Sequence, residues 1–224
     1  MPIVIAGGPS VTDYPREDVI NMASLGFTFA VNDVGLTFPC DVIVSIDPQM
    51  IVKRKEQLKA RGKPIITRCW TFTQDKGKSM GLDIIPLTPR EDCKRDEDYD
   101  RKIIERFPLS GMLACYLADK LAGAANGRKS YVLGMDASVG HFKGHPVANE
   151  TTQYLDEARP LSKYEDMGLT NTINLSMRSK ISCWPKYSKL PNFKKVLVSP
   201  QYRIVALAWL RANASKLFDY AEKK

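Results

Sequence analysis

The sequence lacks the features that mark membrane spans, disulfide frameworks and zinc sites. No run of about 18 apolar residues occurs, so no hydrophobic transmembrane helix is expected. The five cysteines are odd in number and widely spaced, and none forms a C-x-x-C pair. An apolar segment begins too early for a charged signal peptide to precede it. These absences predict a cytoplasmic protein with reduced thiols and no membrane span.

The two common nucleotide-binding signatures, G-x-G-x-x-G and the Walker lysine pattern, are also missing. Instead, the apolar residues 3–6 are followed by Gly7, Gly8, Pro9 and Ser10. An uninterrupted β-branched run predicts a strand buried on both faces, and the glycines allow a tight turn after it. Such a turn either offers its N–H groups to a phosphate or only reverses the chain, and the residues leave both interpretations open.

Apolar runs alternate with helix-forming segments along the chain. Strands are expected at residues 3–6, 27–31, 41–46, 64–67, 83–86, 130–134 and 180–184, and helices at 15–25, 49–61, 112–125 and 199–221. With 224 residues and 44% hydrophobic content, the chain suits one globular domain. The sequence therefore predicts a single Rossmann-like α/β domain over residues 1–224, with a mostly parallel sheet of about seven strands and helices on both faces.

Polar residues follow several of these strands. Because parallel sheets bind ligands outside the carboxyl ends of their strands, we expect these residues to gather at one edge. They are Gly7, Gly8, Ser10, Asn32, Asp33, Asp47 and Asp136.

Ser110 and Gly111 precede the longest apolar helix expected from the sequence. Ser110 is predicted to be the N-cap residue. The N–H groups of the first turn would then face either an anion or the hydroxyl of this serine.

Two segments are predicted to be mobile loops. Residues 88–102 are almost wholly charged, and their acidic D-x-D matches are expected by chance in such a run. Residues 137–170 form a candidate lid that contains both histidines of the chain, His141 and His145. Each histidine is either a surface residue or a general base, since its unperturbed pKa lies near 6.5. No third ligand accompanies the pair, so no metal site is assigned to it.

Positive charge is concentrated toward the C-terminus. The formal net charge is +8, and residues 167–203 carry seven Lys and Arg residues with no Asp or Glu. This run is either a solvated face or a contact for a phosphate-bearing ligand, a nucleic-acid backbone or an acidic membrane. Candidate residues for phosphate or acceptor contacts are Lys143, Lys186 and Lys189.

The order of the short motifs carries a resemblance to a known family. Gly-Gly-Pro-Ser at 7–10, Phe-Ala-Val-Asn at 29–32, Leu-Ser-Gly at 109–111, Tyr-Val-Leu-Gly-Met-Asp at 131–136 and Ile-Ser-Cys-Trp-Pro at 181–185 follow one another. This order resembles the small bacterial sialyltransferases of glycosyltransferase family forty-two, and is similar to archaeal pterin pyrophosphokinases with a G-x-G-P-S start. The resemblance implies that the nucleotide of an activated sugar contacts Gly7, Gly8, Ser10, Asn32, Ser110 and Gly111.

The match weakens in the catalytic half. Asp47 stands where the sialyltransferases have asparagine, their two tyrosines after the Gly-x-Asp strand are not matched, and no histidine follows His145. The candidates for chemistry are therefore His141, His145 and Asp136.

Three functions remain open from the sequence. The first is a glycosyltransferase acting on a hydroxyl of a saccharide or of a hydroxylated nucleic-acid base, with no cofactor besides the activated donor. The second is a pyrophosphokinase that uses a divalent cation held by Asp33, Asp47 or Asp136. The third is a non-catalytic nucleotide or nucleic-acid binder on the same fold.

Overall fold

A computed structural model of the chain describes residues 1–68, 74–87, 107, 109–125, 127–136, 161–187, 199–214 and 216. Several sequence predictions lie outside these residues. They are the charged loop at 88–102, most of the candidate lid, and the residues His141, Lys143, His145 and Lys189.

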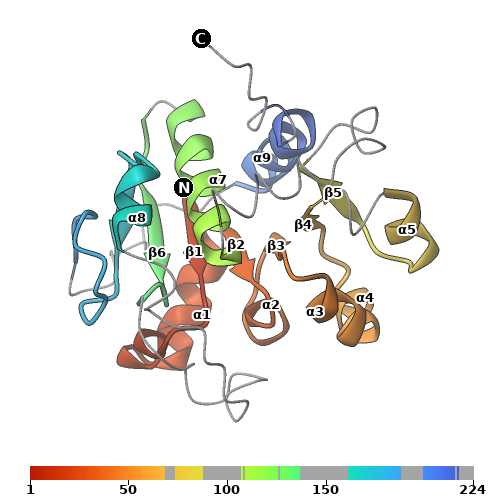
Figure 1. The fold of residues 1–224 in the computed structure, drawn as a ribbon, viewed down its shortest axis with the longest axis horizontal. Coiled ribbons are helices and arrows are strands. Elements are labelled where there is room, and N and C mark those ends of the chain that lie inside the picture. Colours follow the sequence, from red (N-terminus) through yellow and green to blue (C-terminus); the bar gives the residue numbers. More distant parts are fainter. Residues whose placement is uncertain are drawn as a thin grey trace.

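The described strands form one seven-stranded sheet in which every pairing is parallel, in the order β5-β4-β3-β2-β1-β6-β7 (Figure 1). This confirms the predicted α/β class. Strand β1 lies between β2 and β6, and its Ile3 pairs with Thr28 on one side and Tyr131 on the other. The strands are β1 Pro2–Ile5, β2 Phe27–Val31, β3 Val42–Val44, β4 Ile65–Thr67, β5 Ile84–Pro86, β6 Ser130–Leu133 and β7 Thr172–Asn174.

The position of the seventh strand differs from the prediction. Residues 180–184 do not form a strand, and β7 lies at Thr172–Asn174 instead. All three residues of β7 are buried, as a strand covered on both faces requires. In 180–184 only Ile181 and Trp184 are buried, three positions apart, so this segment inserts two side chains into the core. Just after this segment, Lys186 forms a single parallel β-bridge with Asn174 of β7.

Helices cover both faces of the sheet, as predicted (Figure 1). Buried side chains of α1, α2, α3 and α4 share one hydrophobic cluster, and those of α7 and α9 share the other. The described helices are the 3-10 turn η1 Pro9–Asp13, α1 Arg16–Leu25, α2 Val34–Thr37, α3 Pro48–Lys53, α4 Lys55–Arg61, α5 Gln74–Ser79, α7 Ser110–Ala124, α8 Ser162–Asp166 and α9 Pro200–Asn213. None of them is long and apolar enough to cross a membrane.

Two helices depart from their predicted bounds in ways that matter for the site. The helix expected at 49–61 is interrupted at Arg54, which joins α3 to α4 and donates from Nε to Asp33 Oδ1 at 2.8 Å. The residue at the N-cap of α7 is Leu109, so Ser110 already belongs to the first helical turn.

The described part of the candidate lid, residues 161–170, includes α8. Its Tyr164 is 3% exposed and packs edge-on against Trp184, with ring centroids 5.7 Å apart. This part of the segment is therefore anchored in the core on the α7 side of the sheet.

The sheet reverses its winding between β1 and β6. From β1 the chain adds β2, β3, β4 and β5 in one direction, then returns through α7 to place β6 and β7 on the opposite side of β1. The loops that leave β1 and β6 lie next to each other at this reversal, at the carboxyl edge of the sheet. Such a reversal is where open α/β sheets usually bind ligands.

Candidate functional site

The loops that follow β1 and β6 are tied together by hydrogen bonds. The Gly8 N–H donates to the Gly134 carbonyl at 2.9 Å, and the Ser10 N–H donates to Asp136 Oδ2 at 2.7 Å. A Cβ on Gly8 would lie 2.5 Å from both the Gly134 carbonyl oxygen and Asp136 Oδ2. Glycine is thus required here by the close approach of the chain to itself. These two N–H groups stabilise the loop pair.

Ser176, two residues after β7, joins the same network. The Ser176 hydroxyl oxygen lies 2.6 Å from Ser10 Oγ and accepts from the Gly134 N–H at 3.1 Å. The Tyr14 hydroxyl donates to the Leu175 carbonyl at 2.8 Å. Burial raises the pKa of Tyr14, which moves its ionisation further from neutral pH. We call residues 7–10, 134–136 and 176 the β6 side of the site.

Asp136 is the buried carboxylate of the β6 side. It is 5% exposed, and its Oδ2 accepts the Ser10 N–H as described above. Its other oxygen, Oδ1, is buried and has no hydrogen-bond partner in the described part of the chain. Buried polar atoms are almost always paired, so an unpartnered one indicates a further donor such as water or a ligand. Asp136 therefore orients the turn with one oxygen and leaves the second to accept another hydrogen bond.

Asn32 carries a similar unused acceptor at the end of β2. It is the one residue other than glycine with a positive φ among the described residues, at 51°. Its backbone is firmly held, because its N–H donates to the Val44 carbonyl at 3.1 Å and its carbonyl accepts from the Gly35 N–H at 3.2 Å. Its side-chain oxygen Oδ1 is nevertheless buried without a partner in the described ranges. The turn thus fixes the Asn32 backbone, while the amide oxygen of the side chain makes no hydrogen bond in the described structure.

Asp33 directly follows Asn32, and Asp47 follows β3. Both carboxylates already have partners within the fold. Asp33 is 5% exposed and pairs with Arg54 at 2.8 Å. Asp47 is the N-cap of α3 and accepts from the Gln49 N–H at 2.9 Å. Within the described residues, no three His, Cys, Asp or Glu side chains gather to hold a metal ion. Asp33, Asp47 and Asp136 thus serve three separate contacts.

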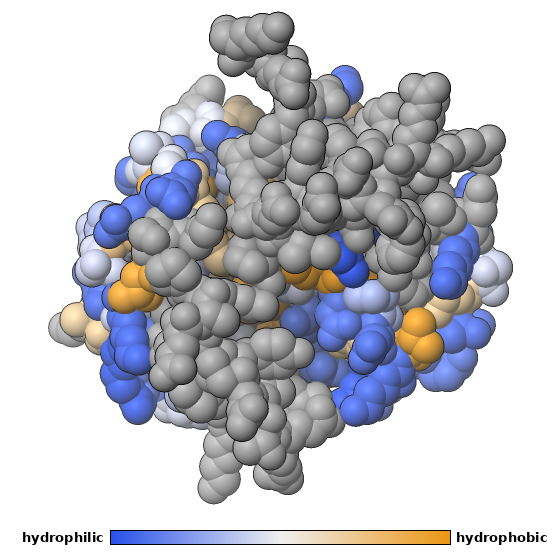
Figure 2. Space-filling view, in the orientation of Figure 1, coloured by the Kyte–Doolittle hydropathy of each residue, from blue (hydrophilic) through white to orange (hydrophobic). Residues whose placement is uncertain are grey.

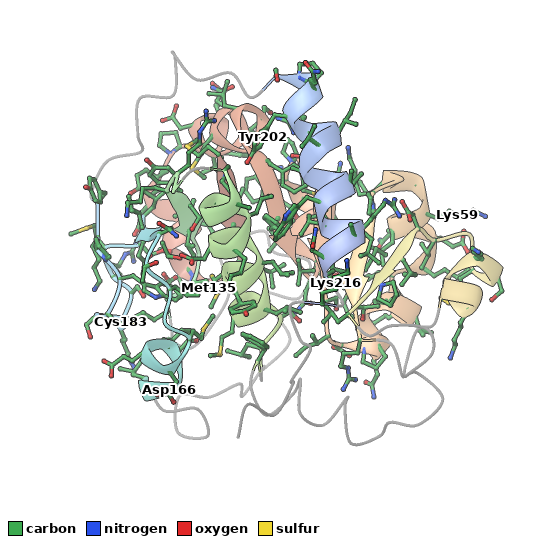
Figure 3. All side chains as sticks on the ribbon, turned by 90° about the horizontal axis from the view of Figure 1, so that it is seen from above. Lys59, Met135, Asp166, Cys183, Tyr202 and Lys216 are labelled. Carbon is green, nitrogen blue, oxygen red and sulfur yellow. The ribbon has the colours of Figure 1, made fainter. Side chains whose placement is uncertain are left out.

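The N-terminus of α7 lies between these two groups of residues. The Ser110 hydroxyl accepts from the Ile46 N–H at 3.0 Å, just after β3, so Ser110 does not cap its own helix. Gly111 packs against Met135, whose sulfur would collide with a Cβ at that position, and Figure 3 shows Met135 beside α7. The predicted N-cap role of Ser110 is wrong because the β3 loop uses its oxygen. We call Asn32, Asp33, Asp47 and Ser110 the β2 side of the site.

Lys186 approaches the β6 side from beyond β7. Its amine donates to the Ser179 carbonyl at 2.6 Å, and the Lys180 N–H donates to the Asp136 carbonyl at 2.9 Å. Ser179 Oγ donates to the Met135 carbonyl at 2.7 Å. The 179–186 segment is thus fastened to the end of β6, and the Lys186 amine takes part in that fastening.

Three residues that shape the site are not among the sequence candidates. Ser176 follows residues 172–175, Thr-Ile-Asn-Leu, whose alternation of polar and apolar side chains is the one signal of a strand that would have indicated it. Tyr14 and Arg54 reach their partners across 161 and 21 residues, respectively. No spacing or motif in the sequence signals these two contacts.

No protein-family model, curated protein or solved structure matches this chain. The chemistry of the site must therefore be inferred from its geometry. The edge offers two buried acceptor oxygens, Asn32 Oδ1 and Asp136 Oδ1, which suit hydroxyl or amino groups of a ligand. Between them lies the N-terminus of a 15-residue helix, whose first N–H groups favour an anion.

Proposed function

We propose that this chain is a glycosyltransferase that moves a sugar from a nucleotide-activated donor to a hydroxyl acceptor. The observation that carries the proposal is the unpartnered Oδ1 of Asn32, held by a left-handed backbone at the end of β2. A non-glycine residue in this conformation with an unused buried acceptor is typical of a binding position. The same asparagine is the residue that the resemblance to sialyltransferases assigns to the donor nucleotide.

The chemistry of the acceptors suits the nucleoside part of a donor. An amide oxygen accepts hydrogen bonds, so Asn32 Oδ1 would bind a ribose hydroxyl or an exocyclic amino group of the base. The phosphates would then lie toward the N-terminus of α7, where backbone N–H groups and the helix dipole favour negative charge. In this proposal Asp136 Oδ1 would accept a hydroxyl of the sugar, because the fold leaves this oxygen without a partner among the described residues.

In the proposed reaction the acceptor oxygen attacks the anomeric carbon of the donor. The new C–O bond forms as the bond between that carbon and the phosphate oxygen breaks, and the nucleotide leaves with the electron pair. The acceptor proton passes to a general base, for which His141 and His145 are the candidates. Both histidines lie outside the described residues.

The described carboxylates favour this reaction over a pyrophosphokinase. That alternative requires a divalent cation held by Asp33, Asp47 or Asp136. Asp33 is paired with Arg54, Asp47 caps α3, and Asp136 binds the Ser10 N–H. Each carboxylate thus has a structural partner, and no three His, Cys, Asp or Glu side chains gather among the described residues.

A thermal-shift screen tests the proposal. CMP, UDP, GDP and ATP are each added with and without magnesium, and a nucleotide at 100 times its Kd should stabilise the protein by about 2.7 kcal/mol. We expect one pyrimidine or guanine nucleotide to raise the Tm without magnesium. The matching nucleotide sugar is then incubated with the protein and hydroxyl acceptors, and release of free nucleotide is measured.

Variants at two asparagines link the shift to the site. Asn32→Gly removes the side chain but keeps a residue that tolerates φ of 51°, so the nucleotide shift should disappear while the fold stays intact. Asn171→Gly makes the same change just before β7, at the opposite edge of the sheet, and should keep the shift. An ATP shift that needs magnesium would contradict the proposal and support the pyrophosphokinase. Binding without nucleotide release from any sugar donor would indicate the non-catalytic binder.

A further inference from the structure

A second segment of the chain, besides the run at 167–203, carries a strong excess of basic residues. Residues 48–80 contain nine Lys and Arg residues against two Asp and Glu, whereas the whole chain has a net charge of +8. This segment includes α3, α4 and α5. Figure 2 shows hydrophilic side chains gathered over these three helices.

The described members of the basic run at 167–203 lie at different places in the fold. Arg178 forms an ion pair with Asp13 at the end of η1, and Lys186 is bound to the Ser179 carbonyl near the β6 side. Arg203 lies in α9 and pairs with Asp41, which precedes β3 at the amino edge of the sheet. These three basic side chains therefore have structural partners on separate elements.

Helices α4 and α5 bring basic side chains close together at one point. Lys55 and Lys59 are one turn apart on α4, and the Lys59 side chain passes beside Gly81, 3.1 Å from where a Cβ of that glycine would lie. Figure 3 shows Lys59 close to α5. On α5, Lys76 and Lys78 are exposed on either side of a glycine that packs against β5. We call Lys53, Lys55, Lys59, Lys76 and Lys78 the α3–α5 basic face.

The closely spaced lysines destabilise the helices that carry them. Like charges four residues apart on a helix repel each other, and the acidic neighbour that Lys55 has in the described structure is Glu56, at 3.8 Å and 79% exposed. An exposed pair of this kind stabilises little. The excess of nine basic over two acidic residues in 48–80 therefore suits an anionic partner.

The α3–α5 basic face begins at the candidate site. Helix α3 starts at its N-cap Asp47, directly beyond β3. Arg54, between Lys53 and Lys55, reaches back to Asp33 beside Asn32. A polyanion lying along α3 and α4 would therefore pass the β2 side of the site.

We propose that the α3–α5 basic face binds the phosphate backbone of duplex nucleic acid and presents it as the acceptor. This inference rests on the proposed function, which it deepens by naming the acceptor class. Residues 48–63 and 74–81 contain no aromatic residue, so these helices offer no ring on which an unpaired base can stack. A helix that lies in a membrane surface exposes a face of Trp, Phe and Leu side chains, which these helices lack. Among the described residues of 48–81, Val52 is the one large apolar side chain that is exposed. Backbone contact with a duplex requires only lysines.

The test measures binding of a short fluorescent DNA duplex of mixed sequence by anisotropy, at salt concentrations from about 50 to 200 mM. The wild-type protein should bind with a steep salt dependence. The triple variant Lys55→Ala, Lys59→Ala and Lys78→Ala should bind more weakly. Its slope of log K against log salt should be smaller by about 0.9 for each phosphate that the variant no longer neutralises.

A matched triple variant controls for net charge. Lys120→Ala near the C-terminal end of α7, with Arg128→Ala and Lys129→Ala between α7 and β6, removes three exposed charges and should leave the slope unchanged. Circular dichroism and Tm confirm that both variants fold. Equal slopes in the two variants, no duplex binding by the wild type at about 50 mM salt, or binding to phosphatidylserine vesicles in place of DNA would each overturn the inference.

The nucleotide thermal shift separates this inference from the proposed function. The lysine variant should keep the full shift, because its substitutions lie outside Asn32, Ser110 and Asp136. A wild-type shift that persists while duplex binding fails overturns the acceptor class alone. Duplex binding in a protein that shows no nucleotide shift overturns the proposed function and leaves the basic face as a nucleic-acid contact.

Discussion

The β6 side and the β2 side of the site lie at the same edge of one sheet but use their polar groups differently. On the β6 side, Ser10, Gly134 and Ser176 bond to one another, and Asp136 has a single unpartnered oxygen. On the β2 side, the Asn32 backbone is held in a left-handed turn while its side-chain oxygen has no partner in the described structure. The first side is built mainly to hold three strands together. Each side leaves one buried acceptor oxygen to a water or a ligand, but on the β6 side the same carboxylate also holds the turn through its second oxygen.

The largest stability effect is expected on the β6 side from Gly8→Ala. The new Cβ would lie 2.5 Å from the Gly134 carbonyl oxygen, a backbone atom that cannot move without separating β1 from β6. We expect unfolding free energy to fall by about 3 kcal/mol or more, measured by urea denaturation. Gly123→Ala in α7 is the control, because the nearest atom to its Cβ is 3.7 Å away, and it should raise stability by about 1 kcal/mol. A near-native Gly8→Ala protein would show that the two loops are not closely packed.

Substitution of Asp136 should have the next largest effect. Asp136→Ala leaves the buried Ser10 N–H without its acceptor, and should lower the unfolding free energy by about 2 kcal/mol. Asp136→Asn keeps an oxygen that can accept this bond and should cost less. If the two variants are equally destabilised, the charge of Asp136 rather than its hydrogen bond holds the turn.

A double-mutant cycle between Ser10 and Ser176 sharpens the comparison further. Each single change to alanine breaks the hydroxyl contact at 2.6 Å and should cost about 1 kcal/mol. The double change should cost less than the sum of the two, by at least about 0.5 kcal/mol, because they share one contact. Additive effects would indicate that the two hydroxyls are not bonded to each other.

The smallest stability effect is expected on the β2 side, from Asn32→Gly. Since Asn32 Oδ1 bonds to nothing in the described fold, loss of the side chain should change the unfolding free energy by less than about 0.5 kcal/mol. Asn32→Ala should cost about 1 kcal/mol, because a Cβ without a local hydrogen bond disfavours φ of 51°. A large loss of stability in Asn32→Gly would make this side structural too, and the distinction between the two sides would fail.

The fold class could be read from the sequence, whereas several details of the site could not. The continuous apolar runs at 3–6, 27–31 and 130–134 indicated buried parallel strands, and the structure confirms them. The strand at 180–184 was wrong, because two buried side chains in an apolar segment do not distinguish a strand from a loop that inserts Ile181 and Trp184 into the core. The break of the 49–61 helix at Arg54 depends on Asp33, and no propensity of the helix itself indicates it.

The sequence by itself determined which residues stand at strand ends, because apolar runs followed by polar residues reflect burial along the chain. This placed Ser10, Asn32 and Asp136 at one edge of the sheet. Only the tertiary structure decided which of their atoms are used by the fold, since hydrogen-bond partners such as Ser176 come from segments far apart in the chain. It likewise placed Arg178, Lys186 and Arg203 of the basic run on separate elements, and brought lysines of α4 and α5 together. Surface charge depends on which helices pack side by side, and that is fixed by the sheet rather than by sequence order.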